Sequence, residues 1–110
     1  MKVCFNGFGE NVLTFETQGT IDVGDPVMIS GNGKVKKATS NFCGVCTGLR
    51  NGYASVQMSG YVRTAYTTAP EVGYSKLSAS NGKVTADDVN GREYLVLDVD
   101  TTEHIVGIIL

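Results

Sequence analysis

The sequence contains no tryptophan, only one histidine (His104) and no apolar run long enough to cross a bilayer as a helix. A membrane-spanning helix needs about 20 mainly apolar residues, so we expect no membrane partner. Residues 1–10 lack the basic and then apolar pattern of a secretory leader. No Asn-x-Ser/Thr glycosylation site occurs either. We therefore expect synthesis in the cytoplasm, where thiols stay reduced.

Positive charge is also scarce. The chain has 9 Lys and Arg against 11 Asp and Glu, which gives a net charge of −2 and an isoelectric point near 5.2. Proteins that bind nucleic acid or anionic lipid by electrostatic attraction carry a basic face. The charge balance predicts neither kind of partner.

Cysteine is too sparse to suggest a metal site or a disulfide framework. The three cysteines are Cys4, Cys43 and Cys46. Successive side chains of a strand point to opposite faces, so Cys43 and Cys46 should diverge unless a bulge intervenes. A zinc site built on Cys43 and Cys46 also lacks a second ligand pair, because only Cys4 and His104 remain as soft ligands. The pattern predicts buried, free thiols, with no disulfide and no metal.

Calcium-binding and catalytic motifs are missing as well. Five carboxylates lie near the C-terminus: Asp87, Asp88, Asp98, Asp100 and Glu103. They do not form the Asp-x-Asp-x-Asp-Gly loop with a terminal Glu that binds calcium, so a solvated acidic edge is expected. No nucleophile elbow, zinc-protease motif or Walker loop is present. We predict no catalytic residues, no cofactor and no enzyme activity.

What the sequence has in abundance is glycine. Fourteen glycines, together with many Val and Thr in short apolar runs broken by turn residues, are typical of an all-β protein. A chain of 110 residues is long enough to bury one small core. We predict a single β domain over residues 1–110, a small barrel or sandwich, with residues 1–11 as a flexible N-terminal arm.

One stretch of the chain occurs twice. Residues 23–35 (VGDPVMISGNGKV) return ungapped, 49 positions later, as residues 72–84 (VGYSKLSASNGKV), and six of the thirteen positions are identical. Asn-Gly between apolar residues is a strong hairpin signal, because only Gly, Asn and Asp adopt positive φ at low cost. The chain is therefore predicted to contain a duplicated hairpin unit, with Asn32-Gly33 and Asn81-Gly82 as equivalent turns.

The residues after each copy correspond too, with a shift of about three residues. Residues 42–49 lead into residues 53–58 as residues 94–99 lead into residues 105–110. In a half-buried strand every second side chain faces the core. On this parity, the predicted core residues are Val45, Leu49, Val56, Met58, Leu95, Leu97 and Val99.

The N-terminal residues are unusually apolar for an arm. Residues 1–11 combine Val3, Phe5 and Phe8 with two glycines, a composition too apolar for a solvated linker and too flexible for a stable lone strand. We expect a partner chain to cover them. Val3, Phe5 and Phe8 are thus candidate contacts with another chain. Thr67 and Thr68, in a segment that breaks the strand pattern, are further candidates.

Five short motifs follow one another along the chain. They are Asn11-Val12-Leu13-Thr14-Phe15, Val23-Gly24-Asp25-Pro26-Val27, Gly33-Lys34-Val35, Gly44-Val45 and the terminal apolar strand of residues 105–110. In this order they resemble the small capsid cement (decoration) proteins of tailed bacteriophages. The resemblance covers most of the chain.

The resemblance implies an all-β structural protein of the virion. Such a protein would bind the outside of the phage head, contact the major capsid protein and stabilise the shell, commonly as a homotrimer. It would be synthesised in the host cytoplasm and be located on the capsid exterior. An alternative function is that of a small carbohydrate- or ligand-binding β module. Such a module would use a platform of exposed tyrosines: Tyr53, Tyr61, Tyr66 and Tyr74.

Overall fold

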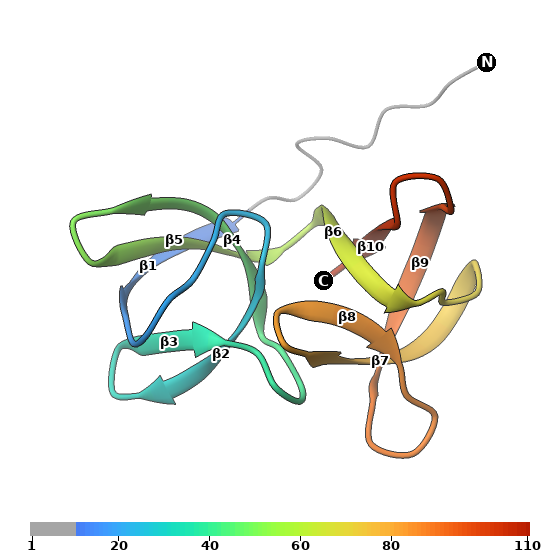
Figure 1. Cartoon of the computed structure of the whole chain (residues 1–110), viewed down its shortest axis with the longest axis horizontal. Coiled ribbons are helices and arrows are strands. Elements are labelled where there is room, and N and C mark those ends of the chain that lie inside the picture. The colour runs from blue at the N-terminus through green and yellow to red at the C-terminus, as the bar shows by residue number, and fades with distance from the viewer. Residues whose placement is uncertain (1–10) are drawn as a thin grey trace.

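The computed structural model describes residues 11–110, which form ten strands and no helix (Figure 1). The predicted all-β class is therefore confirmed. The strands are β1 (Asn11–Thr17), β2 (Pro26–Gly31), β3 (Lys34–Lys37), β4 (Gly44–Arg50), β5 (Tyr53–Ser59), β6 (Tyr61–Thr68), β7 (Gly73–Ser80), β8 (Lys83–Ala86), β9 (Arg92–Asp100) and β10 (Ile105–Ile109).

The strands form two closed five-stranded barrels that follow one another along the chain (Figure 1). The first barrel has the strand order β1-β3-β2-β4-β5 and the second the order β10-β6-β8-β7-β9. In each barrel the first strand pairs with the third in parallel, and all other pairings are antiparallel. The two barrels thus share one topology. The duplication predicted for a hairpin extends to a whole barrel, in which β1 to β5 correspond to β6 to β10.

The register of the strands repeats as well. In the parallel pairs, Thr17 lies opposite Val35 and Tyr66 lies opposite Val84, so the spacing of 49 residues holds for both members. The fourth strand of each barrel carries a bulge, in which one residue has no partner on the next strand. This residue is Thr47 in β4 and Leu97 in β9.

The two predicted hairpin turns are similar but not identical. Gly33 and Gly82 both have positive φ, at 70° and 75°, as the Asn-Gly signal predicts. Asn81 also has positive φ, at 50°, whereas Asn32 does not. The difference coincides with a shift of register between Ile29 and Gly31 that β7 does not share.

The interior consists of two apolar clusters. We call the first the first-barrel core, and it consists of Ile21, Val27, Val35, Cys46, Ala54 and Val56. The second, the second-barrel core, includes three residues of the first half of the chain, namely Ala38, Phe42 and Val45. Its other members are Val62, Tyr66, Leu77, Ala79, Val84, Tyr94, Val96, Val106 and Ile108. The second barrel is therefore completed by side chains from the first half of the chain.

Polar contacts reinforce the seam between the barrels. The Phe42 and Tyr94 rings stack with centroids 4.9 Å apart, and the Tyr94 hydroxyl donates to the Phe42 carbonyl at 2.9 Å. The Thr64 hydroxyl donates to the Gly24 carbonyl at 2.8 Å. Buried polar groups need such partners, because an unpaired one costs about 1–3 kcal/mol. The seam is therefore packed and hydrogen-bonded like a protein interior.

The predicted core is right in part. Val45 and Val56 are buried, Met58 packs against the first-barrel core, and Val99 packs against the second-barrel core. The prediction is wrong for Leu49, because this residue is 43% exposed at an open end of the first barrel.

The prediction also fails for Leu95 and Leu97. Tyr94 and Val96 occupy the core positions of β9, at 4% and 0% exposure, and both leucines are only partly buried. The bulge at Leu97 explains why Val99 still faces the core, because an extra residue inverts the alternation of a strand. The apolar run of residues 94–97 gave no sign of this.

Candidate binding surfaces on the first barrel

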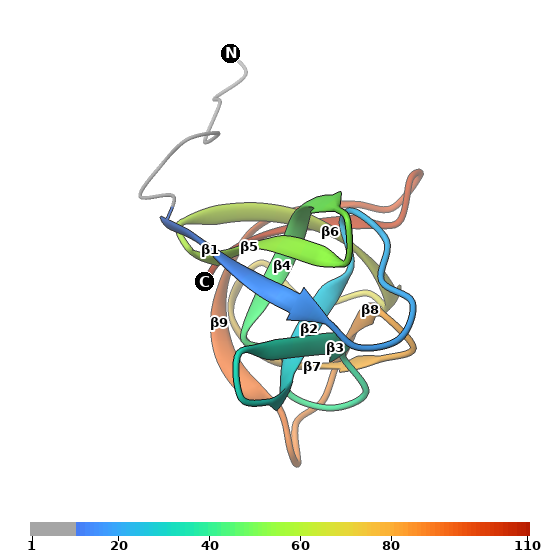
Figure 2. The same ribbon diagram turned by 90° about the vertical axis from the view of Figure 1, so that its left-hand side faces the viewer.

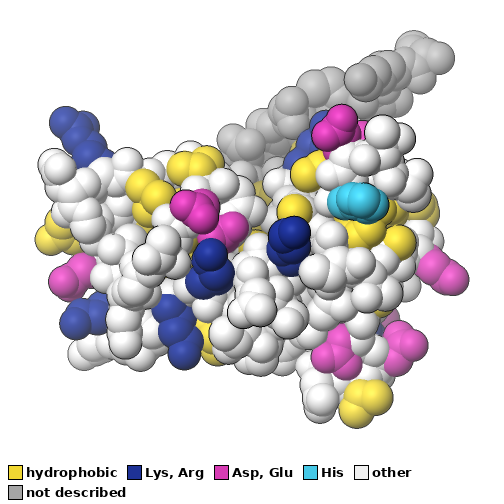
Figure 3. Space-filling view, viewed as in Figure 1, with side chains coloured by type: hydrophobic (Ala, Val, Ile, Leu, Met, Phe, Trp, Pro, Cys, Tyr) yellow, Lys and Arg dark blue, Asp and Glu magenta, His cyan; other side chains and the backbone are white. Residues whose placement is uncertain are grey.

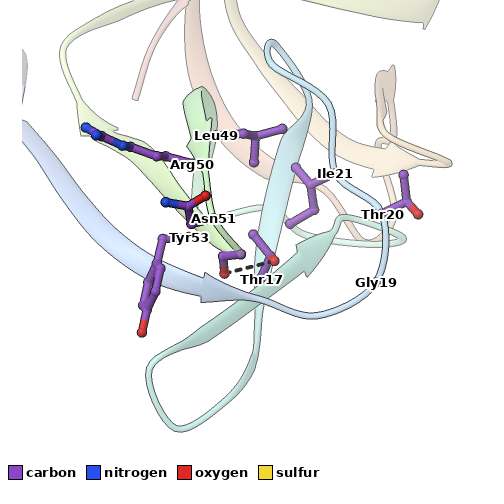
Figure 4. A pocket seen from close by; sticks show the side chains of 9 residues that line it. Thr17, Gly19, Thr20, Ile21, Leu49, Arg50, Asn51 and Tyr53 are labelled. Carbon is purple, nitrogen blue, oxygen red and sulfur yellow. Dashed lines mark hydrogen bonds between the residues drawn. The ribbon is translucent and has the colours of Figure 1, made fainter.

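The first barrel is open at the end next to the Asn51-Gly52 turn. A pocket of about 300 Å³ lies there between the turn and residues 19–21 (Figure 4). Figure 4 shows Leu49 and Ile21 facing one another across this pocket. The Thr17 hydroxyl donates to the Gly52 carbonyl at 3.1 Å and so ties β1 to the turn. The result is a cavity with two aliphatic walls and a polar rim.

A second hollow lies against the same hairpin. It measures about 470 Å³ and is lined by Thr14, Gly48, Ser55 and Tyr53 among others. Thr14, Gly48 and Ser55 lie in one row across β1, β5 and β4. Because two of these side chains are small and Gly48 has none, the row forms a shallow depression beside the exposed Tyr53 ring, which is 54% exposed.

Strand β1 presents apolar side chains to solvent. Val12 is 50% exposed and Leu13 is 54% exposed. One edge of β1 pairs with β5, but on the other edge only Glu16 and Thr17 pair with β3. Within residues 11–110 no strand pairs with that edge of residues 11–15. Figure 2 shows β1 crossing the end of the molecule, with only its C-terminal end close to β3.

The two cysteines that the structure describes are free. Cys46 lies in the first-barrel core, and Cys43 packs against the same core. The prediction that they diverge is wrong, because Cys43 precedes β4 and the alternation of that strand does not apply to it. Burial raises the pKa of both thiols, so both stay protonated and poorly nucleophilic at neutral pH. Cys4 lies outside the described residues.

Two of the acidic side chains act as loop caps. Asp87 Oδ1 accepts from the Asn90 and Val89 N–H groups at 2.9 and 3.1 Å, and its Oδ2 accepts from the Ser78 hydroxyl at 2.9 Å. These bonds, led by the one from Asn90, lower the pKa of Asp87. Figure 3 shows acidic side chains beside an apolar one at the lower end of the second barrel, where this loop lies.

Asp100 has the same arrangement in the next loop. Its Oδ1 accepts from the Glu103 and Thr102 N–H groups, both at 3.0 Å, and these bonds lower the pKa of Asp100. Both carboxylates are therefore engaged with backbone donors. Over residues 11–110, no group of three or more His, Cys, Asp or Glu is placed to hold a metal ion.

The tyrosine platform that the alternative function would use does not form. Tyr61 and Tyr66 are buried, each 5% exposed, and Tyr66 belongs to the second-barrel core. Tyr53 and Tyr74 are exposed but lie on different barrels. His104, the single histidine, is exposed, and its ring lies nearly perpendicular to the Tyr66 ring with the two centroids 5.7 Å apart.

The candidate contact residues fall in two places. Val3, Phe5 and Phe8 lie outside the described residues. Thr67 and Thr68 are exposed and form the end of β6, so this segment continues the strand that it was expected to break.

Sequence reasoning did not single out Thr17 or Ile21, which line the pocket at the end of the first barrel. A signal was available in the repeat. Extending the ungapped spacing of 49 residues upstream from residues 23–35 aligns Thr17 with Tyr66, a small side chain with a large one.

Comparison with protein-family models, with curated proteins and with solved structures gave no match. Among residues 11–110, no helix has the length and apolar character needed to span a bilayer.

Proposed function

We propose that the protein is a capsid decoration protein. In this role it binds the outside of a tailed-phage head, contacts the major capsid protein and stabilises the shell, after synthesis in the host cytoplasm. The proposal rests on the five motifs that resemble this family, four of which lie in the first barrel, and on one surface of that barrel.

The surface that carries the proposal is the exposed first half of β1. Its counterpart in the second barrel is the first half of β6, 49 residues later. There Tyr61 and Val62, the counterparts of Val12 and Leu13, are each 5% exposed. Val62 belongs to the second-barrel core, and the nearby Thr64 donates to the Gly24 carbonyl across the seam. The equivalent surface is thus covered in the second barrel and exposed in the first.

A surface of this kind fits another polypeptide. The edge of residues 11–15 that pairs with no strand of residues 11–110 offers backbone N–H and C=O groups, and Val12 and Leu13 offer apolar area beside it. Strand addition combines these two contributions. We place the contact with the capsid protein here and extend it to Val3, Phe5 and Phe8, which directly precede β1 in the sequence. Thr67 and Thr68 are proposed as a further contact, and the bound form as a homotrimer.

Titration of the protein against capsids stripped of decoration tests the proposal. We expect stoichiometric, saturable uptake, measured by co-sedimentation. Val12→Asp should weaken uptake by at least about tenfold, equivalent to about 1.4 kcal/mol, because it places a charge in the contact. Val89→Asp is the matched control, since Val89 is 87% exposed on the second barrel.

Lack of uptake of the unaltered protein would refute the function. Equal uptake of the two variants would show that β1 is not the contact.

A further inference from the structure

The open end of the first barrel has a closed counterpart in the second barrel. Thr17 and Tyr66 are equivalent, since each lies opposite a fully buried valine on the parallel strand. Gly52 and His104 are equivalent too. The Thr17 N–H donates to the Gly52 carbonyl at 2.9 Å, and the Tyr66 N–H donates to the His104 carbonyl at 3.1 Å. Gly52 and His104 also share positive φ, at 81° and 56°.

In the second barrel two rings close this end. The Tyr66 ring is part of the second-barrel core and meets the His104 ring edge to face. Its hydroxyl donates to the Asp100 carbonyl at 3.4 Å. In the first barrel a threonine and a glycine replace the two rings, and the pocket of about 300 Å³ lies beside them.

In the first barrel a different aromatic residue fills the interior. This residue does not close the open end of the barrel beside the Asn51-Gly52 turn, which we call the mouth. The residue is Phe15, two residues before Thr17 on the same strand, where the second barrel has Thr64. Phe15 packs against the first-barrel core and does not line the pocket. The interior is therefore filled while the mouth stays open.

We propose that the mouth of the first barrel binds a tyrosine side chain presented by another polypeptide. The aliphatic walls formed by Ile21 and Leu49 suit an aromatic ring, and a cavity of about 150 Å³ already holds benzene in another protein. Arg50 is the counterpart of Asp100, because each ends the fourth strand of its barrel and pairs with the residue that opens the fifth. The Arg50 carbonyl therefore corresponds to the acceptor of the Tyr66 hydroxyl. This proposal does not depend on capsid binding.

The probe is N-acetyl-tyrosinamide, which presents a tyrosine side chain with peptide groups on both sides. It is titrated into the full chain and followed by amide and methyl NMR. We expect saturable shifts confined to the surroundings of Thr17, Ile21, Leu49 and Gly52. N-acetyl-alaninamide at the same concentrations should give no saturable shift.

Two variants carry the same new side chain on opposite faces of β1. Thr17→Tyr should close the mouth as Tyr66 does and weaken probe binding at least about tenfold. Thr14→Tyr, on the exposed face that lines the other hollow, should bind the probe as the unaltered chain does.

Shifts that do not saturate, or that centre on other residues of the unaltered chain, would overturn the proposal without any variant. So would equal binding by folded Thr17→Tyr and Thr14→Tyr proteins.

Discussion

In strand β10, Gly107 lies opposite Asp98 of β9 and Arg63 of β6. A Cβ at this position would overlap the Asp98 carboxylate and the Tyr61 hydroxyl. That hydroxyl donates to Asp98 Oδ1 at 2.9 Å. The missing side chain of Gly107 thus makes room for a hydrogen bond between β6 and β9, the two strands that flank β10.

Gly107→Ala should lower the free energy of unfolding by about 1–3 kcal/mol, because the added methyl group must displace a buried tyrosine or its partner. Gly48→Ala is the control, since the nearest atom to a Cβ there is 3.9 Å away. Urea unfolding of both variants gives the comparison. Equal losses would mean that the space around Gly107 is not limiting.

Asp87 and Asp100 should make stability depend on pH. Both have lowered pKa values because backbone N–H groups donate to the carboxylates. A carboxyl with a lowered pKa in the folded state stabilises the fold fully above the ordinary Asp pKa of about 3.9. This contribution is lost as the pH falls through the lowered pKa.

The double variant Asp87→Asn, Asp100→Asn should therefore melt below the unaltered protein at neutral pH, and the gap should shrink below about pH 4. Thermal unfolding followed by circular dichroism from neutral to acid pH measures it. A gap that stays constant over this range would show that the two charges do not contribute.

At the scale of elements, turns were easier to predict than strand faces. A tight hairpin turn needs a backbone conformation that Asn and Gly adopt more easily than other residues, so the Asn-Gly pairs alone indicate the positions of the turns at Gly33 and Gly82. The inward face of a strand depends on unbroken alternation, and one unpaired residue at Thr47 or Leu97 inverts it. Nothing in the run Tyr94-Leu95-Val96-Leu97 marks where the bulge lies, because all four residues are apolar.

Val96→Ala should therefore cost more stability than Leu97→Ala, although leucine loses more atoms. Val96 is fully buried in the second-barrel core, and its truncation should cost roughly 1–3 kcal/mol. Leu97 is the unpaired residue of the bulge and only partly buried. Denaturant unfolding of both variants measures the order, and a larger loss for Leu97→Ala would restore the alternation first inferred from the sequence.

The candidate surfaces were harder to foresee than the fold. The apolar character of Val12 and Leu13 is plain in the sequence, but their exposure follows from β3 reaching only the last two residues of β1. The pocket arises from Thr17 and Gly52, which are distant in the chain and meet because the barrel closes. Only a comparison of the two halves of the sequence could have drawn attention to them.

At the scale of the whole molecule, the seam should make the two barrels unfold together. The second-barrel core includes Ala38, Phe42 and Val45, so loss of the first barrel removes part of the second. We expect one unfolding transition, with coincident curves for NMR probes at Ala54 and Val106, which lie in different barrels. Two separated transitions would show that the barrels are independent.

Phe42→Ala should destabilise the protein by about 3–5 kcal/mol, because it removes a buried ring that stacks on Tyr94. The same pair of NMR probes reports this loss. An effect limited to the first barrel would contradict the shared core.

The second-barrel core depends on residues of the first half of the chain, but the first-barrel core does not depend on the second half. All members of the first-barrel core, and the side chains packed against it, come from residues 15–58, whereas the second-barrel core needs residues from both halves. A ribosome delivers the N-terminal part of a chain first. When the second half emerges, Phe42 and Val45 have already been synthesised, so the second barrel can pack against them as it folds. A circularly permuted gene that encodes the second barrel first should therefore yield nascent chains that stay sensitive to protease until the first barrel follows.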